Sequence, residues 1–259
     1  MSGTTFLAVD WSGARKPAGK IWLAAVTGGT LQRLEACASR EAAIDAVLAY
    51  GRSASRVVAG FDFSFSLPLW FQRDLGVADA PGLWAVVAAE GEHWLRDVRP
   101  PFWGRPGSRR PELPAHFRET EEALARAACI APKSTFQVAG AGTVGTGSLR
   151  GMPHLATLRS HGWAIWPFDD AGRLTAIEIY PRLFTGPVTK SRRQAREAYL
   201  AGTPWPWTEA HREAACSCED AFDAAVSALV MSGHDAALTR LPARTGVARR
   251  EGEVWMPPR

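Results

Sequence analysis

Four acidic residues stand where buried elements could bring their carboxylates together. These residues are Asp10, Asp62, Glu178 and Asp223. The first two each follow a run of apolar residues typical of a buried strand, the third lies inside such a run, and the fourth flanks the apolar stripe of a helical segment. Carboxylates held close together cannot all stay ionised without a cation, and oxygen ligands suit Mg²⁺ or Mn²⁺. We therefore expect a divalent metal site.

Each acid also has a purely structural interpretation. Asp10 could simply accept hydrogen bonds from the turn at Ser12 and Gly13. Glu219 and Asp220 fall at the start of the C-terminal helix, where the helix dipole favours carboxylates in any protein. Asp223 is harder to explain in this way because it lies beside the buried stripe, so we expect it to point toward Asp10 and Asp220 to lie nearer solvent.

The first sixty residues predict elements that would place Asp10 beside Asp62. We expect an antiparallel meander of three strands, a helix capped by Ser39 and ending at Gly51, and a further strand parallel to the first. The expected strands cover residues 6–10, 20–26, 31–36 and 57–62. Neighbouring strands lie about 5 Å apart, so both aspartates would leave the sheet at the same edge.

The rest of the chain predicts an insertion and a second group of elements. A helical insertion rich in Trp, Pro and Arg occupies about 64–160, with helices near 80–97 and 114–129. Residues 163–168 and 174–180 suggest a hairpin, although the first could be an independent strand. A helix follows Cys218, and residues 253–256 could add an edge strand. We expect one α/β domain over residues 1–259.

Basic residues in two segments are candidates for contact with a phosphate backbone. Arg105, Arg109 and Arg110 lie on an irregular segment beside Phe102 and Trp103, a composition that suits phosphates and stacked bases. Lys190 and Arg193 belong to a second basic run, on a short expected helix. A solvated loop and a solvated helix face are the alternatives. The glycine-rich run 140–148 precedes a helix but has neither Walker A nor dinucleotide-binding spacing.

Composition sets wider limits. The chain has 259 residues, 46% of them hydrophobic, and a formal net charge of +4, which permits nucleic-acid binding without requiring it. No apolar run approaches the length of a membrane span, and residues 1–5 do not begin a secretory signal. We expect a cytoplasmic protein without a membrane partner.

The order of these short motifs resembles domain-of-unknown-function family 429, the predicted RNase H-like nucleases. The residues that carry the resemblance are Val9-Asp10-Trp11-Ser12-Gly13, Gly60-Phe61-Asp62-Phe63-Ser64, Ile177-Glu178-Ile179-Tyr180-Pro181 and Asp220-Ala221-Phe222-Asp223-Ala224. The resemblance implies an RNase H-like mixed sheet of five strands flanked by helices. It also implies hydrolysis of phosphodiester bonds in DNA or RNA by two metal ions.

The resemblance further implies Asp10, Asp62 and Asp223 as ligands, with Glu178 or Asp220 completing the site. Many members of that family have a second acid shortly after the Glu-x-x-Pro motif, whereas this chain has Arg182. Two other functions fit the same elements. One is an actin-like ATP-dependent phosphotransferase, although no second meander follows residue 64; the other is a scaffold that binds nucleic acid or protein without cutting.

Overall fold

The computed structural model describes residues 3–107, 109–128, 131–140 and 143–258. Its strands are β1 (Thr4–Asp10), β2 (Trp22–Thr27), β3 (Thr30–Ala36), β4 (Arg56–Phe61), β5 (Ala164–Ile165) and β6 (Leu174–Glu178). Its helices are α1 (Arg40–Ser53), α2 (Leu69–Asp74), α3 (Ala80–Asp97), α4 (Glu119–Ala128), α5 (Gly145–Ser160), α6 (Arg182–Thr185), α7 (Arg193–Ala201), α8 (Glu209–Ser217), α9 (Glu219–Gly233), α10 (Asp235–Leu238) and α11 (Ala248–Glu251).

The strands form one mixed sheet in the order β3-β2-β1-β4-β6-β5. The pairs β3–β2 and β2–β1 are antiparallel, whereas β1–β4, β4–β6 and β6–β5 are parallel. The predicted meander, the helix between β3 and β4, and the parallel pairing of β1 with β4 are therefore confirmed. The sheet has six strands among the described residues, where five were expected, because β5 adds a short sixth at the edge.

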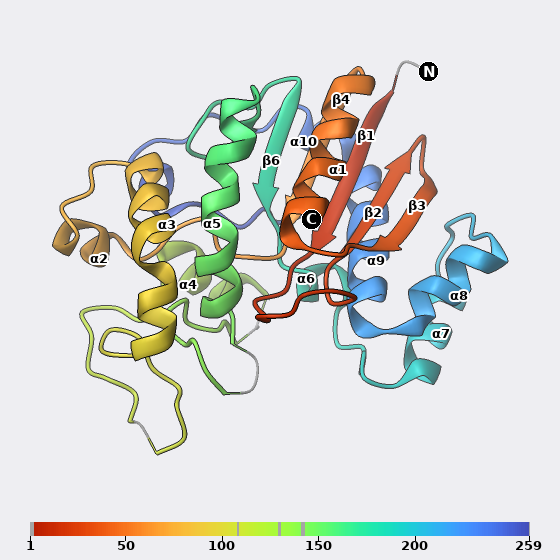
Figure 1. The fold of residues 1–259 in the computed structure, drawn as a ribbon. Helices are drawn as coiled ribbons and strands as arrows, with labels where there is room; N and C mark the ends of the chain where they lie inside the picture. Colours follow the sequence, from red (N-terminus) through yellow and green to blue (C-terminus); the bar gives the residue numbers. More distant parts are fainter. Residues whose placement is uncertain (1–2, 108, 129–130, 141–142, 259) are drawn as a thin grey trace.

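Helices cover both faces of the sheet, so the molecule has three layers (Figure 1). Leu7 and Val9 of β1 pack in the core beneath α1, α3 and α5, whereas Phe6 and Ala8 pack in the core beneath α9. This alternation follows from the two-residue period of a strand. Successive side chains of β1 thus belong to different layers, and the layer of an acid follows from its position in the strand.

Local signals explain where α1 and α9 begin. The Ser39 side chain accepts a hydrogen bond from the Ala42 amide, as predicted, and the helix runs on through the buried Gly51 to Ser53. Cys218 caps α9 through its sulfur, which accepts from the Ala221 amide at 3.4 Å. The fully buried Phe222 of α9 is worth about 1.5–3 kcal/mol by burial of its side chain.

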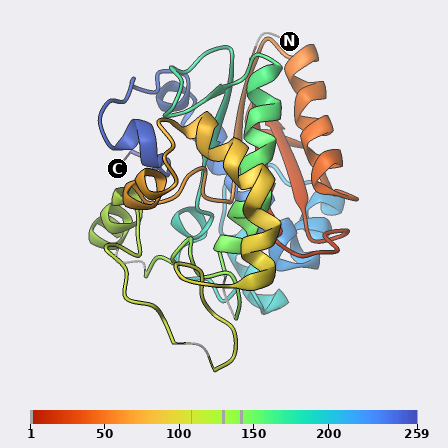
Figure 2. The same cartoon turned by 60° about the vertical axis from the view of Figure 1, so that its left-hand side comes forward.

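The segment between β4 and β5 contains α2, α3, α4 and α5, and it extends to one side of the sheet (Figures 1 and 2). The helix expected near 80–97 is α3. The helix expected over 114–129 is α4, which starts later because residues 111–118 are irregular and the side chain of Glu121 accepts from the Arg118 amide.

Two expectations for the last hundred residues need correction. Residues 163–168 and 174–180 form no hairpin, because β5 and β6 are parallel and the chain between them must return to the starting end of β5. Residues 253–256 form an isolated parallel bridge between Val254 and Glu178 rather than a strand. No helix among the described residues is long and apolar enough to cross a membrane.

Candidate metal centre

Asp10 and Asp62 lie next to each other at the carboxyl edge of the sheet. Val9 is paired with Phe61 in the parallel register, and the Asp62 amide donates to the Val9 carbonyl at 3.1 Å. Asp10 continues the alternation of Phe6 and Ala8 and so belongs to the face that α9 covers. The expectation that both aspartates leave the sheet at one edge is confirmed.

Helix α9 adds two further carboxylates on this side of the sheet. Asp223 is buried, with 7% of its surface exposed, whereas Asp220 is partly exposed and Glu219 is exposed. The predicted difference between Asp223 and Asp220 is therefore confirmed. It arises because Asp223 follows the fully buried Phe222 and lies on the flank of the stripe that packs on the sheet.

The acids on this face raise one another's pKa values. Burial and the neighbouring Asp62 and Asp223 raise the pKa of Asp10 well above its usual value. Burial and Asp223 raise the pKa of Asp62 to about 7. Burial raises that of Asp223 to about 6, although Lys190 opposes the shift. The pKa of Asp220 is also raised, by burial and Glu219.

Their hydrogen bonds leave most of these oxygens unused. Among the described residues no hydrogen bond reaches the carboxylate of Asp10 or Asp62. The turn after β1 is instead held by Ser12, whose hydroxyl accepts from the Ala14 amide, so the structural interpretation of Asp10 is contradicted there. Asp223 pairs through Oδ2 with Lys190, and its buried Oδ1 has no partner among the described residues.

The donor set fits a hard divalent ion. Asp10, Asp62, Asp223 and the outer Asp220 offer only oxygen atoms, and the unpartnered Oδ1 of Asp223 is a buried acceptor that a cation would satisfy. In their present positions, no three His, Cys, Asp or Glu side chains among the described residues converge as closely as ligands of one ion. The ammonium of Lys190, paired with Asp223, supplies positive charge at the cluster in this structure.

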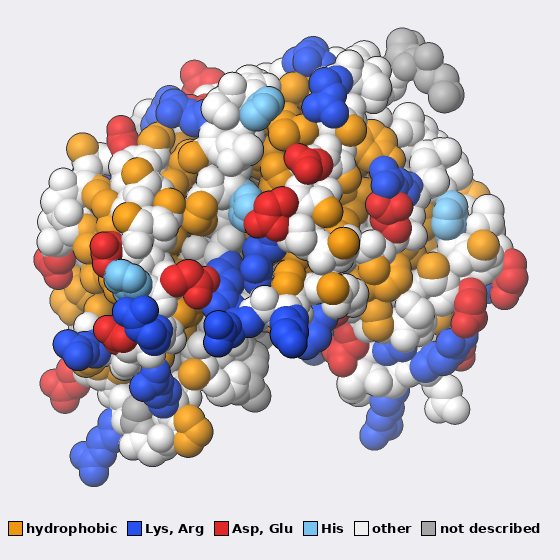
Figure 3. All heavy atoms as spheres, in the orientation of Figure 1, with side chains coloured by type: hydrophobic (Ala, Val, Ile, Leu, Met, Phe, Trp, Pro, Cys, Tyr) orange, Lys and Arg blue, Asp and Glu red, His pale blue; other side chains and the backbone are white. Residues whose placement is uncertain are grey.

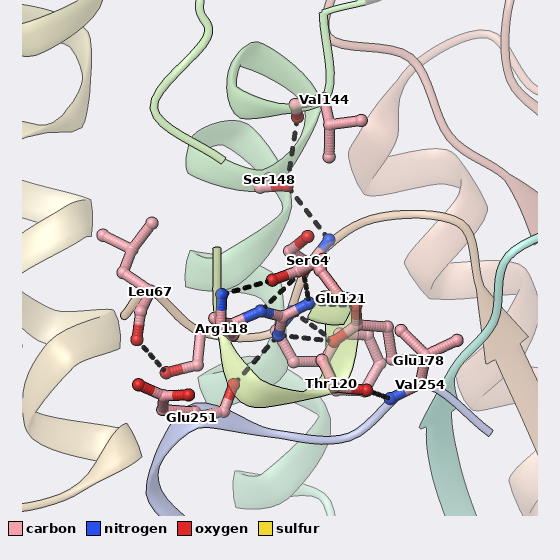
Figure 4. Close-up of polar contacts among 12 residues, drawn as sticks. Ser64, Leu67, Arg118, Thr120, Glu121, Val144, Ser148, Glu178, Glu251 and Val254 are labelled. Carbon is pink, nitrogen blue, oxygen red and sulfur yellow. Dashed lines mark hydrogen bonds and ion pairs between the residues drawn. The ribbon is translucent and has the colours of Figure 1, made fainter. Parts of the chain in front are cut away.

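Glu178 is close enough to raise the pKa of Asp62. Its oxygens, however, already accept hydrogen bonds (Figure 4). Both oxygens pair with the guanidinium of Arg118, and Oε2 also accepts from the Phe65 amide at 2.9 Å. Arg118 is fully buried and additionally pairs with Glu121 and donates to the Glu251 carbonyl. Glu178 is held in place by a buried ion pair, and moving it away from Arg118 toward the aspartates would be costly.

The strand alternation explains why Glu178 differs from the aspartates. Its neighbours Ile177 and Ile179 pack in the core beneath α9, whereas Ala176 packs in the opposite core. Glu178 follows Ala176 to that opposite face, where the insertion supplies Arg118. The acids thus share one sheet edge but not one face.

The predicted backbone-contact residues of the insertion lie apart from the cluster. Arg105 donates to the Arg96 carbonyl, and Arg110 lies over the rings of Trp103 and Phe117 at 5.5 and 5.8 Å from their centroids. Arg109 is exposed. In Figure 1 this loop lies below α3, away from α9. The structure does not bring this loop and the carboxylates together.

Of the second basic pair, only Lys190 joins the cluster. It lies in the segment before α7, not on the expected helix, and the ammonium reaches Asp223. Arg193, in the first turn of α7, is exposed and pairs with Glu197 and Glu213. Its charge is therefore shared with two surface carboxylates.

A basic loop beside Asp10 was not predicted from the sequence. Arg15, Lys16 and Lys20 lie at exposed positions in the segment between β1 and β2. Lys20 partly opposes the rise in the pKa of Asp220. Figure 3 shows Lys and Arg side chains gathered in the lower middle of this face, where Figure 1 draws that loop. Their proximity in sequence to Asp10 was the available signal.

Two arginines from the helical layer fix the start of this loop. Arg40 of α1 donates to the carbonyls of Ser12 and Ala14, and Arg150 of α5 donates to that of Gly13. Gly13 itself crosses the first turn of α5 so closely that a Cβ there would lie 2.5 Å from the Gly147 amide nitrogen. The predicted glycine-rich run thus permits packing against the loop after β1; its residues 141–142 lie outside the described part of the chain.

A pocket opens beside Asp62. Its cavity volume is about 160 Å³, and its wall includes Trp11, Ser64, Lys133 and Tyr180. Burial, followed by the nearby Asp62, raises the pKa of Tyr180. Tyr180 belongs to one of the sequence motifs, but no role was expected for it; its position two residues beyond Glu178, at the same sheet edge, was the available signal.

Comparison with known proteins adds no relative: no protein-family profile matches the sequence, and neither a curated protein nor a solved structure matches the chain significantly.

Proposed function

We propose that the protein is a metal-dependent nuclease that hydrolyses phosphodiester bonds at the carboxylate cluster. One observation carries the proposal: Asp10, Asp62 and Asp223 crowd together with raised pKa values, and the first two accept no hydrogen bond from the described residues. Holding three carboxylates this close is costly when Lys190 is the one cation paired with them among the described residues, so a bound cation would explain their arrangement. Mg²⁺ or Mn²⁺ is the ion we propose.

The sheet topology supports an RNase H-like fold for this nuclease. The order β3-β2-β1-β4-β6, with only the first three strands antiparallel, agrees with the fold that the sequence motifs imply. The motif resemblance and the strand order are independent of each other, because the motifs are local and the order is not.

The residues at the cluster have different roles in the proposed function. Asp10, Asp62 and Asp223 hold the metal, Asp220 modulates it from the more exposed side, and Lys190 balances the charge of Asp223 until metal binds. Divalent ions in such a site supply an activated water and stabilise the leaving oxygen. Arg15, Lys16 and Lys20 bind substrate phosphates beside the cluster.

Replacing Asp10 by Asn tests the proposal. Asp10→Asn should abolish Mn²⁺ binding in a calorimetric titration and metal-dependent cleavage of nucleic acid. It should leave the free energy of unfolding without metal unchanged or higher, because the substitution removes a buried charge that its neighbours repel. Asp45→Asn, at an exposed position of α1, is the matched control and should retain both activities.

Two outcomes would reject the assignment. One is unchanged Mn²⁺ binding in Asp10→Asn, and the other is a loss of several kcal/mol of stability, which would give Asp10 a structural role.

The ion pair between Lys190 and Asp223 favours a second candidate, a scaffold that binds nucleic acid without cutting. In that case Lys190 is the permanent counter-ion of the cluster. The wild-type protein would then bind nucleic acid but would not bind Mn²⁺, which the same titration measures.

A further inference from the structure

The pocket beside Asp62 has the features of a ligand site that the proposed chemistry alone does not require. It is bounded on one side by the carboxyl ends of β4 and β6 and on the other by the start of α5. Its wall includes Asp62, so a group seated in it lies next to the proposed metal centre. The exposed Lys133 of the insertion contributes a positive charge.

Polar groups in the pocket are available for a ligand. Ser64 uses its backbone amide to bind Ser148, but among the described residues no hydrogen bond uses the hydroxyl of Ser64 or of Tyr180. Both residues line the pocket, and Tyr180 is partly exposed. The carboxylates of Glu121 and Glu178 also line the wall, but Arg118 holds both. The free hydroxyls can each donate or accept.

The apolar part of the wall includes two aromatic side chains. Trp11 and Phe63 lie with ring centroids 5.0 Å apart, and Ile179 adds an aliphatic surface. Aromatic side chains provide stacking surfaces for nucleobases whatever their sequence. An unstacked base combines a flat apolar face with polar edges, which matches this wall and the two hydroxyls.

The size of the pocket limits what can enter. A cavity of about 150 Å³ holds a benzene-sized group, and this one has about 160 Å³. The pocket therefore has room for one six-membered ring but not for two paired bases. A base can enter only when it is unpaired, as at a single strand or a frayed end.

We propose that this pocket binds the pyrimidine base of one unpaired nucleotide, whose phosphate then lies at the carboxylate cluster. The inference rests on the proposed nuclease function and narrows its substrate to single-stranded nucleic acid. Ser64 and Tyr180 contact the edge of the base, and Trp11 and Phe63 contact its face.

Nucleotide titrations of the full chain test the inference. In calorimetry with Mn²⁺ present, thymidine and uridine 5′-monophosphates are the probes, followed by a thymidine-containing oligonucleotide as a single strand and as a duplex. The wild-type protein should bind at least one of the two monophosphates. It should bind the single strand at least about tenfold more tightly than the duplex.

Thr143→Trp fills the pocket from a partly exposed position at its wall and should weaken mononucleotide binding at least about tenfold. Thr157→Trp, at an exposed site of α5, is the control for bulk. Tyr180→Phe should weaken binding of the monophosphates less than Thr143→Trp does, and Tyr199→Phe, whose hydroxyl donates to Phe184 outside the pocket, should not weaken it.

The outcomes separate the two proposals. Mononucleotide binding that survives Thr143→Trp, or a duplex bound as tightly as a single strand, would overturn the pocket assignment. Mn²⁺ bound by the wild type without any mononucleotide binding would also overturn it and would leave the metal site standing. Mononucleotides bound in the pocket by a protein that does not bind Mn²⁺ would support the pocket and reject the nuclease.

Discussion

Asp223 is the residue whose surroundings most favour the proposed cation. Lys190 satisfies one of its oxygens, and the other is buried without a partner among the described residues. Its neighbour one turn earlier, Asp220, is partly exposed and keeps access to water. We therefore expect the proposed ion to depend more on Asp223 than on Asp220.

Substitution of these two aspartates should have unequal effects. Asp223→Ala should remove Mn²⁺ binding and activity, whereas Asp220→Ala should keep a measurable fraction of both, because an outer carboxylate tunes a site more than it builds one. Calorimetric titration with Mn²⁺ compares them. Full retention of binding in both variants would mean that α9 contributes packing alone.

At the scale of elements, the sequence predicted the parts of the site that depend on local order. Apolar runs and the Ser39 cap were enough to predict β1, α1 and β4. The position of Asp10 and Asp62 at the same edge of the sheet followed from these elements. The position of Glu178 could also have been derived, since Ile177 and Ile179 alternate with it across the strand. Its partner could not, because Arg118 lies 60 positions away in an irregular segment with no periodicity to read.

The buried network around Arg118 should be essential to stability. Arg118→Met leaves the carboxylates of Glu178 and Glu121 buried without their cation, and losing one partner of such a pair costs about 3–5 kcal/mol. Urea denaturation measures the loss. Arg159→Met, which breaks the exposed pair with Asp169, should cost about 1 kcal/mol or less. Equal small losses would show that the network is not a stabilising one.

The loop between β1 and β2 and the arginine-rich loop of the insertion can be compared as phosphate-binding elements. Simultaneous substitution of Arg15, Lys16 and Lys20 by Ala should weaken binding to nucleic acid and flatten its dependence on salt. The log–log slope should become shallower by about 0.7 for each single-strand phosphate that the variant no longer neutralises. The matched triple substitution is that of Arg105, Arg109 and Arg110. We expect it to have the smaller effect, and an effect restricted to this second triple would identify the insertion as the phosphate-binding surface.

At the scale of the whole molecule, the raised pKa values link stability to pH. Asp62 and Asp223, with pKa values of about 7 and about 6, hold protons in the folded state that the unfolded chain releases near its usual value of 3.8. Because the folded state binds more protons in this range, the stability of the metal-free protein should fall as pH rises from about 4 to about 7.

Divalent metal should reverse this dependence. Mn²⁺ competes with protons for the same oxygens, so the rise in Tm on adding Mn²⁺ should be small at about pH 5 and large at about pH 8. Thermal unfolding at both pH values with and without Mn²⁺ measures it. In Asp62→Asn without metal, the fall in stability between about pH 4 and about pH 7 should be smaller than in the wild type. A fall of unchanged size would mean that groups outside the cluster cause it.

The contacts made by the last residues of the chain have a consequence for its synthesis. The carbonyl of Glu251 accepts a hydrogen bond from Arg118, and its carboxylate accepts from the amides of Leu69 and Glu119. The Val254 amide donates to the Thr120 hydroxyl, and the Trp255 amide donates to the Glu178 carbonyl. Domains are made from the amino end at about 5–20 residues per second. The strands that lead to Asp10 and Asp62 are therefore available early, but the contacts of the insertion with residues 251–255 form only when translation has passed residue 255. A chain that stops before residue 251 leaves the guanidinium of Arg118 without the carbonyl of Glu251 that it binds in the folded protein.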